Sequence, residues 1–299
     1  MGVCHMFVKR FVWGCVMGVL LSAGASAADG PSTGSGSAKG GGFPFFAFCM
    51  DTHDSEKRDV TEQAALLKEL GYDGLGHLWL DGLEERVKSL EGTGLRLFQL
   101  CLRVNLSKDK APYDPRLKEL IPLLKGQRSQ LTLIMSGLPP SDESGDARAV
   151  EIVREIADLA QAQEAQVILY PHTNDWMERV EDGVRVAKKV NRPNVGTMFN
   201  LCHWLKVDGK SDLRVLLGDA MPHLFAVSVH GADKAEAVQS GDGNWIQALG
   251  QGSYDVGAFL KLLEELKYTG PVGLQCYGIQ GDARTHLTQS IAAWKRYNK

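Results

Sequence analysis

The chain has 299 residues, of which 44% are hydrophobic, and its formal net charge is −3 at pH 7. This composition supplies enough apolar surface for a large core, which excludes the fibrous and disordered classes. A mildly acidic chain without a basic run also argues against nucleic acid as a partner.

The first 28 residues have the pattern of a signal peptide. Lys9 and Arg10 precede an uncharged apolar run over residues 11–21, and Ala25-Ser26-Ala27 is a small-residue cleavage site. The apolar run is short for a membrane span, so we predict export to the periplasm or the cell exterior, with an uncleaved anchor as the alternative. Residues 1–28 hold two positive charges and no negative ones, so their removal lowers the formal net charge from −3 to −5.

A Gly/Ser-rich stretch over residues 29–42 is predicted to be a flexible linker. After it, eight short apolar runs alternate with amphipathic stretches, and the runs start at residues 43, 72, 95, 130, 166, 194, 224 and 271. Nearly continuous apolar runs are typical of parallel strands covered by helices. The mean repeat is roughly 32 residues, close to one βα unit. We therefore predict an α/β fold, a single (β/α)8 TIM barrel over residues 43–299. A doubly wound open sheet is disfavoured because no GxGxxG follows the first run.

Two of the amphipathic stretches give specific helix predictions. In the seventh, a 3.6-residue period predicts a buried stripe of Val256, Phe259, Leu260, Leu263 and Leu266 that ends before Gly270-Pro271. In the fifth, Asp175 and Glu178 predict a capping box, and the buried stripe consists of Trp176, Val180, Val184 and Ala187.

Polar residues fall at the C-terminal ends of the last four predicted strands. Side chains alternate across a strand, so the bulky apolar set faces the helices and the other set faces the barrel interior. The interior set then becomes polar at one mouth, where we place Tyr170, His172, Asn200, His230 and Gln275. The alternative for any one of them is a hydrogen-bonded polar group of the core.

The loops after the strands are rich in tryptophan. Trp79, Trp176, Trp204 and Trp245 follow the second, fifth, sixth and seventh strands, and such rings can stack on the apolar face of a sugar. The alternative is that some of them only pack loops. The long loop over residues 231–252 contains GDGNW and is a candidate lid.

Four cysteines remain after residue 28, and they lack metal-site spacing. Each lies in or beside an apolar run, so we expect buried free thiols at Cys49, Cys101, Cys202 and Cys276. A disulfide between Cys49 and Cys276 is the alternative, because the first and last strands of a closed barrel are neighbours.

Three passages resemble the xylose isomerase-like TIM barrel superfamily, the sugar phosphate isomerase/epimerase family, which also holds endonuclease IV. They are NLCH at 200–203, VSVHGAD at 227–233, and LGQGSYD followed by LKYTGPVGLQ between 249 and 275. The resemblance extends over residues 43–297 and implies a TIM barrel that acts on sugars.

The resemblance also implies a metal site and its residues. In active isomerases and epimerases of this family, Glu, Asp, His and Glu from strands five to eight hold one divalent metal, and the two glutamates move the substrate proton. The matching positions here are Tyr170, Asn200, His230 and Gln275, so one ligand type of four is retained. The resemblance places a sugar-contacting histidine at His203, and His172 follows the first glutamate position by two residues.

These replacements change the chemistry that the site can perform. Amides and a phenol supply no negative charge to a hard divalent ion. An amide cannot act as a general base at neutral pH, and a phenol with a pKa of about 10 is a poor one. The three histidines, His172, His203 and His230, remain as candidate bases or zinc ligands.

We therefore predict an exported sugar isomerase or epimerase, or a lyase on oxidised sugars, that transfers a proton next to a carbonyl. Its predicted catalytic positions are Tyr170, His172 and Gln275, and its cofactor, where the site keeps one, is a divalent Mn, Mg or Zn ion. The alternative is a non-catalytic sugar-binding barrel that has lost the metal and the glutamate bases. An acidic, exported chain disfavours a metal-dependent nuclease. Export disfavours a phosphorylated sugar, although residues 278–284 lie where barrels often bind phosphate.

Overall fold

Eight parallel strands form one closed barrel in the computed structural model, which describes residues 42–298. Each strand pairs with the next along the chain, and the eighth pairs with the first. The strands are β1 (Phe45–Phe48), β2 (Gly74–Leu78), β3 (Arg96–Asn105), β4 (Gln130–Ser136), β5 (Gln166–Leu169), β6 (Val195–Asn200), β7 (Leu224–Val229) and β8 (Val272–Gln275). The predicted (β/α)8 barrel is confirmed.

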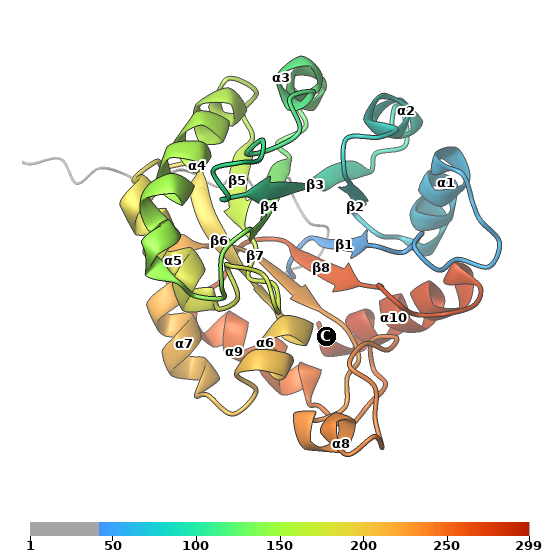
Figure 1. Ribbon diagram of the computed structural model, residues 1–299. Coiled ribbons are helices and arrows are strands. Elements are labelled where there is room, and N and C mark those ends of the chain that lie inside the picture. The colour runs from blue at the N-terminus through green and yellow to red at the C-terminus, as the bar shows by residue number, and fades with distance from the viewer. Residues whose placement is uncertain (1–41, 299) are drawn as a thin grey trace, which may run out of the picture. The chain divides into compact units, whose positions relative to one another are not determined.

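Helices surround this barrel, as Figure 1 shows. They are α1 (Val60–Leu70), α2 (Leu83–Ser89), α3 (Leu117–Leu120), α4 (Asp146–Gln161), α5 (Val180–Val190), α6 (Leu201–Val207), α7 (Leu213–Ala220), α8 (Ala235–Gln239), α9 (Val256–Glu265) and α10 (Ala283–Tyr297). Short 3-10 turns add η1 (Ile121–Leu124), η2 (Glu143–Gly145) and η3 (Met221–His223). The predicted signal peptide and all of the predicted linker except Gly42 lie outside the described residues. No helix within residues 42–298 is long and apolar enough to cross a membrane.

Local sequence explains where the helices begin and end. Asp59 accepts the backbone N–H of Glu62 (2.9 Å), and the Glu62 carboxylate accepts the N–H of Asp59 (2.9 Å), which starts α1. The helix ends at Gly71, whose φ of 85° is accessible to glycine without strain. In α9 the predicted stripe is buried at Val256, Phe259, Leu260 and Leu263.

The predicted capping box at Asp175 and Glu178 is wrong. Helix α5 begins at Val180, and the Asp182 carboxylate accepts the backbone N–H groups of Glu178 (3.2 Å) and Arg179 (3.0 Å). Asp175 is unavailable as a cap because its carboxylate contacts His172 (2.8 Å). The loop before α5 is therefore longer than the sequence pattern indicated, and it lies at the mouth.

The predicted alternation of side chains is confirmed on the strands of the second half except at Phe225 in β7, which packs against the interior cluster rather than the helices. One set packs between barrel and helices and includes Val167, Leu169, Val195, Phe199, Val227, Val229, Val272 and Leu274. The other set fills the barrel and includes Phe46, Phe48, Phe98, Cys101, Ile134, Ile168, Tyr170, Met198 and Ala226. The polar positions therefore sit at the mouth above an interior cluster of aromatic and aliphatic side chains.

All four cysteines of the described chain are free and buried. This confirms the expected thiols and makes the alternative disulfide between Cys49 and Cys276 wrong. Burial raises the pKa of both of these thiols, so they behave as small apolar groups of the core.

Candidate active site

A hydrogen-bonded pair of side chains follows strands β5 and β6 at the floor of the mouth. Asn200 Nδ2 donates to the Tyr170 hydroxyl (2.8 Å), and Asn200 Oδ1 accepts the backbone N–H of His203 (3.2 Å), which starts α6. Burial raises the pKa of Tyr170 well above its ordinary value. Tyr170 is therefore a neutral phenol at physiological pH and does not act as a base.

His203 is held in one tautomer by the loop after β5. The backbone N–H of Thr173 donates to His203 Nδ1 (3.2 Å), and the Thr173 hydroxyl lies 3.1 Å from the same atom. Because a backbone N–H can only donate, Nδ1 bears the lone pair and Nε2 bears the proton. Burial lowers the pKa of His203 well below its ordinary value, and positive charge on His172, Lys206 and His230 acts in the same direction. His203 is therefore a neutral donor through Nε2.

His172 and Asp175 form a dyad beside His203. His172 Nδ1 lies 2.8 Å from Asp175 Oδ2 and 3.1 Å from the Thr173 carbonyl oxygen, so both neighbours favour a proton on Nδ1. The His172 ring lies 4.1 Å from the His203 ring and is nearly perpendicular to the ring of Tyr170. The His172 side chain is 30% exposed, and its Nε2 has no hydrogen-bond partner among residues 42–298. A carboxylate behind an imidazole orients the ring and stabilises the imidazolium, so this pair is arranged as a general base.

His230 follows β7, and Gln275 is the last residue of β8. His230 Nδ1 donates to the carbonyl oxygen of Gly231 (2.9 Å), and its buried Nε2 has no partner within the described chain. Burial lowers the pKa of His230 to about 4. Gln275 is buried, and its Oε1 accepts the backbone N–H of Tyr277 (3.3 Å). His230 thus adds a neutral hydrogen-bond acceptor, and the Gln275 side-chain oxygen accepts a hydrogen bond from the loop that follows β8.

The four positions that the resemblance assigns to a metal do not fit a divalent ion. The Tyr170 hydroxyl and the oxygens of Asn200 and Gln275 each accept a hydrogen bond and are neutral, and among these four positions His230 Nε2 is a buried atom without a partner in the described residues. Over residues 42–298, no group of three or more His, Cys, Asp or Glu side chains is placed to hold a metal. One imidazole without a carboxylate does not balance the charge of Mn, Mg or Zn. The predicted metal centre therefore has no suitable set of ligands here.

Two of the four predicted sugar-stacking tryptophans are corrected by the structure. Trp176 is fully buried, and its Nε1 donates to the Asp142 carbonyl oxygen (2.7 Å). Trp204 is 7% exposed, and its Nε1 donates to the Ser211 hydroxyl (3.0 Å). Both rings pack in the layer between barrel and helices, so neither offers a face to a ligand.

The other two tryptophans are partly exposed, and their sugar-binding role stays a prediction. Trp79 has a φ of 67° and lies against the barrel's interior cluster, with the Arg103 guanidinium 5.2 Å from its ring centre. Such a backbone conformation is unusual for a bulky residue and is most often found at functional sites. Trp245 lies in the loop after β7, with the ammonium of Lys206 5.8 Å from its ring centre.

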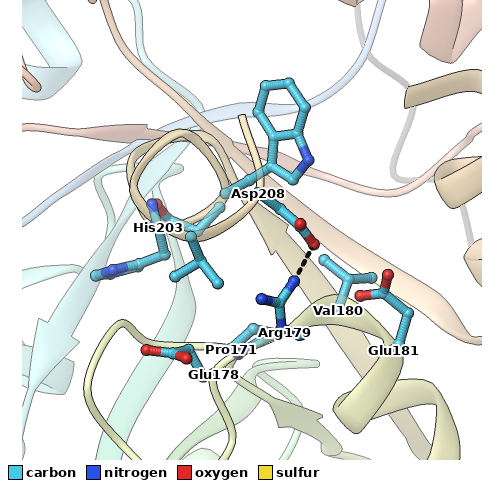
Figure 2. A pocket seen from close by; sticks show the side chains of 10 residues that line it. Pro171, Glu178, Arg179, Val180, Glu181, His203 and Asp208 are labelled. Carbon is cyan, nitrogen blue, oxygen red and sulfur yellow. Dashed lines mark hydrogen bonds and ion pairs between the residues drawn. The ribbon is translucent and has the colours of Figure 1, made fainter. Parts of the chain in front are cut away.

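A small pocket behind His203 is structural. Figure 2 shows the Arg179 guanidinium directed at the Asp208 carboxylate across this pocket, and the two groups form an ion pair of 2.5 Å. The pair joins the start of α5 to the end of α6. The free space is about 10 Å³, room for about one water, so no sugar fits there.

Sequence reasoning missed Thr173 and Asp175 as site residues. Thr173 fixes the tautomer of His203, and Asp175 fixes that of His172. The three-residue spacing between His172 and Asp175 could have identified Asp175 as a site residue. The same spacing from Asp175 to Glu178 indicated a helix cap instead.

Comparisons with known proteins agree with this fold. The family described as xylose isomerase-like TIM barrel matches residues 64–297. The chain has no match among the curated proteins.

Several solved structures are similar over most of the chain. A D-allulose 3-epimerase from Methylomonas sp. has a TM-score of 0.66 at 16% identity, over 86% of this chain and 99% of the epimerase. A 3-keto-D-glucoside 4-epimerase from E. coli has a TM-score of 0.65 at 14% identity, over 85% and 99% of the two chains. The IolI protein with a bound zinc atom has a TM-score of 0.64 at 15% identity, over 85% and 97%. At these identities the similarity establishes the shared fold.

Proposed function

This chain belongs to the xylose isomerase-like TIM barrel family, and on that premise we propose that it is an exported carbohydrate isomerase or epimerase whose base is His172. The observation that carries the proposal is the 2.8 Å contact between His172 Nδ1 and Asp175 Oδ2 at the mouth. Export is supported by the charged, apolar and small-residue segments of residues 1–28.

The dyad supplies a proton acceptor that needs no metal. The lone pair on His172 Nε2 takes the proton from a carbon next to the sugar carbonyl, and the C–H electron pair forms an enediolate. Asp175 stabilises the imidazolium that results. Return of the proton by His172 to the neighbouring carbon gives an isomer, whereas uptake of a proton from water on the opposite face of the same carbon, with loss of the first proton from His172 to solvent, gives an epimer.

Neighbouring groups favour the negative charge that develops on the carbonyl oxygen. His203 presents an Nε2–H donor beside the His172 ring, and both His203 and His230 lie in the positive field of Lys206. Donors fixed in advance near a developing oxyanion are an effective form of catalysis. A single imidazole base suits a substrate with an acidic C–H, such as a ketose or a keto-glycoside.

The test is the exchange of sugar C–H with solvent deuterium, followed by NMR for a panel of ketoses and keto-glycosides. We expect exchange with wild-type protein, a loss of about 100-fold or more in His172→Gln, and a smaller loss in Asp175→Asn. His223→Gln is the matched control, because this residue precedes β7 at the opposite end of the barrel. Exchange should also survive treatment with a chelator.

Two results would contradict this function. Exchange that a chelator abolishes and added Mn or Zn restores would mean that the site recruits a metal despite its ligands. Sugar binding without exchange across the whole panel would support the alternative, a non-catalytic sugar-binding barrel.

A further inference from the structure

A second hollow lies beside the mouth, between the loops that follow β7 and β8 and against α10. Its volume is about 460 Å³, and its lining is dominated by uncharged amide side chains. We call it the amide groove, defined by Asn244, Gln247, Gln251, Gln280, Gln289 and Asp282.

The charged groups of the groove do not favour a phosphate. Loops after the seventh and eighth strands are where barrels often bind phosphate, yet no Lys or Arg is among the described residues that line this hollow. The charged group there is Asp282, which caps α10 by accepting the N–H of Arg284 (2.9 Å) and pairs with Arg58 (2.8 Å). An anionic ligand would meet this carboxylate at the helix end that would otherwise attract it.

The amides keep hydrogen-bonding capacity that suits hydroxyl groups. Gln251 donates to Gln289 (3.2 Å), Gln280 donates to the Gly278 carbonyl oxygen (3.2 Å), and Gln247 donates to Asp233 (2.7 Å). Each of these bonds uses one N–H, so the three donating amides keep free carbonyl oxygens and further N–H groups. Mixed donors and acceptors without net charge match the hydroxyls of a neutral sugar.

An exposed aromatic ring lies in the loop after β8, between Gln275 and the groove residue Gly278 in the sequence. Tyr277 is 55% exposed and follows Gln275, which faces the mouth, and precedes Gly278, which lines the groove. Its ring stands edge-on to His53 at 5.3 Å. An exposed ring at this place can stack against the apolar face of a sugar.

The walls of the groove are fixed in advance. Asp54 accepts the backbone N–H of Ala283 (3.1 Å), and Arg58 bridges Asp54 (2.9 Å) and Asp282 (2.8 Å). These bonds tie the first loop of the barrel to the start of α10. A site that is already ordered loses little conformational entropy when a ligand binds.

We propose that the amide groove is a subsite for a second, uncharged sugar residue, so that the protein takes a disaccharide or glycoside rather than a free or phosphorylated monosaccharide. The proposal rests on the proposed function for the sugar in the mouth. Tyr277 then lies between the two sugar positions.

Calorimetric titration of the mature protein tests this with glucose, glucose 6-phosphate, cellobiose, maltose and trehalose. We expect at least one disaccharide to bind about 10-fold or more tightly than glucose, the gain from two or three hydrogen bonds. Gln251→Ala combined with Gln289→Ala should remove this gain, because both exposed side chains line the groove. Gln161→Ala is the matched control, an exposed glutamine at the end of α4 on the opposite side of the barrel.

Disaccharides that bind no more tightly than glucose, or that bind equally well to the double variant, would overturn the subsite. Preferential binding of glucose 6-phosphate would overturn it as well. The same titrations with His172→Gln separate the two proposals, because this variant should lose deuterium exchange and keep the disaccharide preference. A retained disaccharide preference without deuterium exchange in wild type would overturn the proton transfer alone, and exchange on free ketoses without that preference would overturn the groove alone.

Discussion

The buried imidazole of His230 should make the protein less stable as the pH falls below about 6.5. Burial lowers its pKa to about 4 in the folded protein, whereas in the unfolded chain the pKa returns to about 6.5. Between these values the unfolded chain binds a proton that the folded protein does not, so the free energy of unfolding falls with the pH. The full difference corresponds to about 3 kcal/mol between pH 7 and pH 4.

Urea denaturation at several pH values between 7 and 4.5 measures this for wild type and for His230→Asn. Asparagine keeps an N–H near the position from which Nδ1 donates to Gly231. The carboxylates contribute equally to both proteins, so the difference between the two curves isolates His230. We expect wild type to lose about 2 kcal/mol more than the variant by pH 4.5.

Parallel curves for the two proteins would refute this reasoning. An NMR titration in which the His230 ring takes up a proton near pH 6.5 in the folded state would refute it directly. Burial also lowers the pKa of His203, so the His230→Asn variant should itself still lose some stability as the pH falls.

Three further predictions concern packing. Gly183→Ala in α5 should lower the free energy of unfolding by about 1–3 kcal/mol, because the new Cβ would lie 2.1 Å from Thr197 Oγ1. Gly218→Ala in α7 places its Cβ within 4 Å of no other atom and should raise the free energy of unfolding by about 0.5–1 kcal/mol. Shifts of the thermal midpoint in opposite directions check the pair. Trp176→Phe should cost about 1 kcal/mol through the lost bond to Asp142 and leave sugar affinity in calorimetry unchanged; weaker binding would restore this ring to the site. A protein that spans residues 29–299 should react with a thiol reagent at four cysteines after denaturation without reductant, and at none while it is folded. Reaction at two cysteines would reveal a disulfide.

Strand alternation was enough to predict which side chains enter the barrel. The outer residues, such as Val167 and Phe199, are bulky because they fill the space under helices, and the inner position of Asn200 follows from parity alone. Closure of the barrel then brings the ends of β5 to β8 together without any further information. The fold, and the convergence of these polar side chains at one end of the barrel, were therefore accessible from the sequence.

Loop residues were not predictable in the same way, because their side chains follow no period. Trp79 and Trp176 both follow a strand, yet one is partly exposed and the other is fully buried. Asp175 could cap a helix or pair with a histidine three residues earlier, and both patterns have the same spacing. The path of the loop after β5 decided between them.

The polar side chains of this mouth form one connected hydrogen-bond network. Asn200 joins Tyr170 to the first turn of α6 and so holds His203, which Thr173 fixes as an Nε2–H donor. Opposite tautomers follow for His172 and His230, whose Nδ1 atoms are held by a carboxylate and by a carbonyl oxygen.

The mouth therefore combines one imidazole donor with two imidazole acceptors, all in fixed tautomers. Proton transfer needs a donor and an acceptor side by side, and the ring centres of His203 and His172 lie 4.1 Å apart. We therefore expect that Asn200→Asp alone would not create a metal centre, because the other three positions would still lack negative charge.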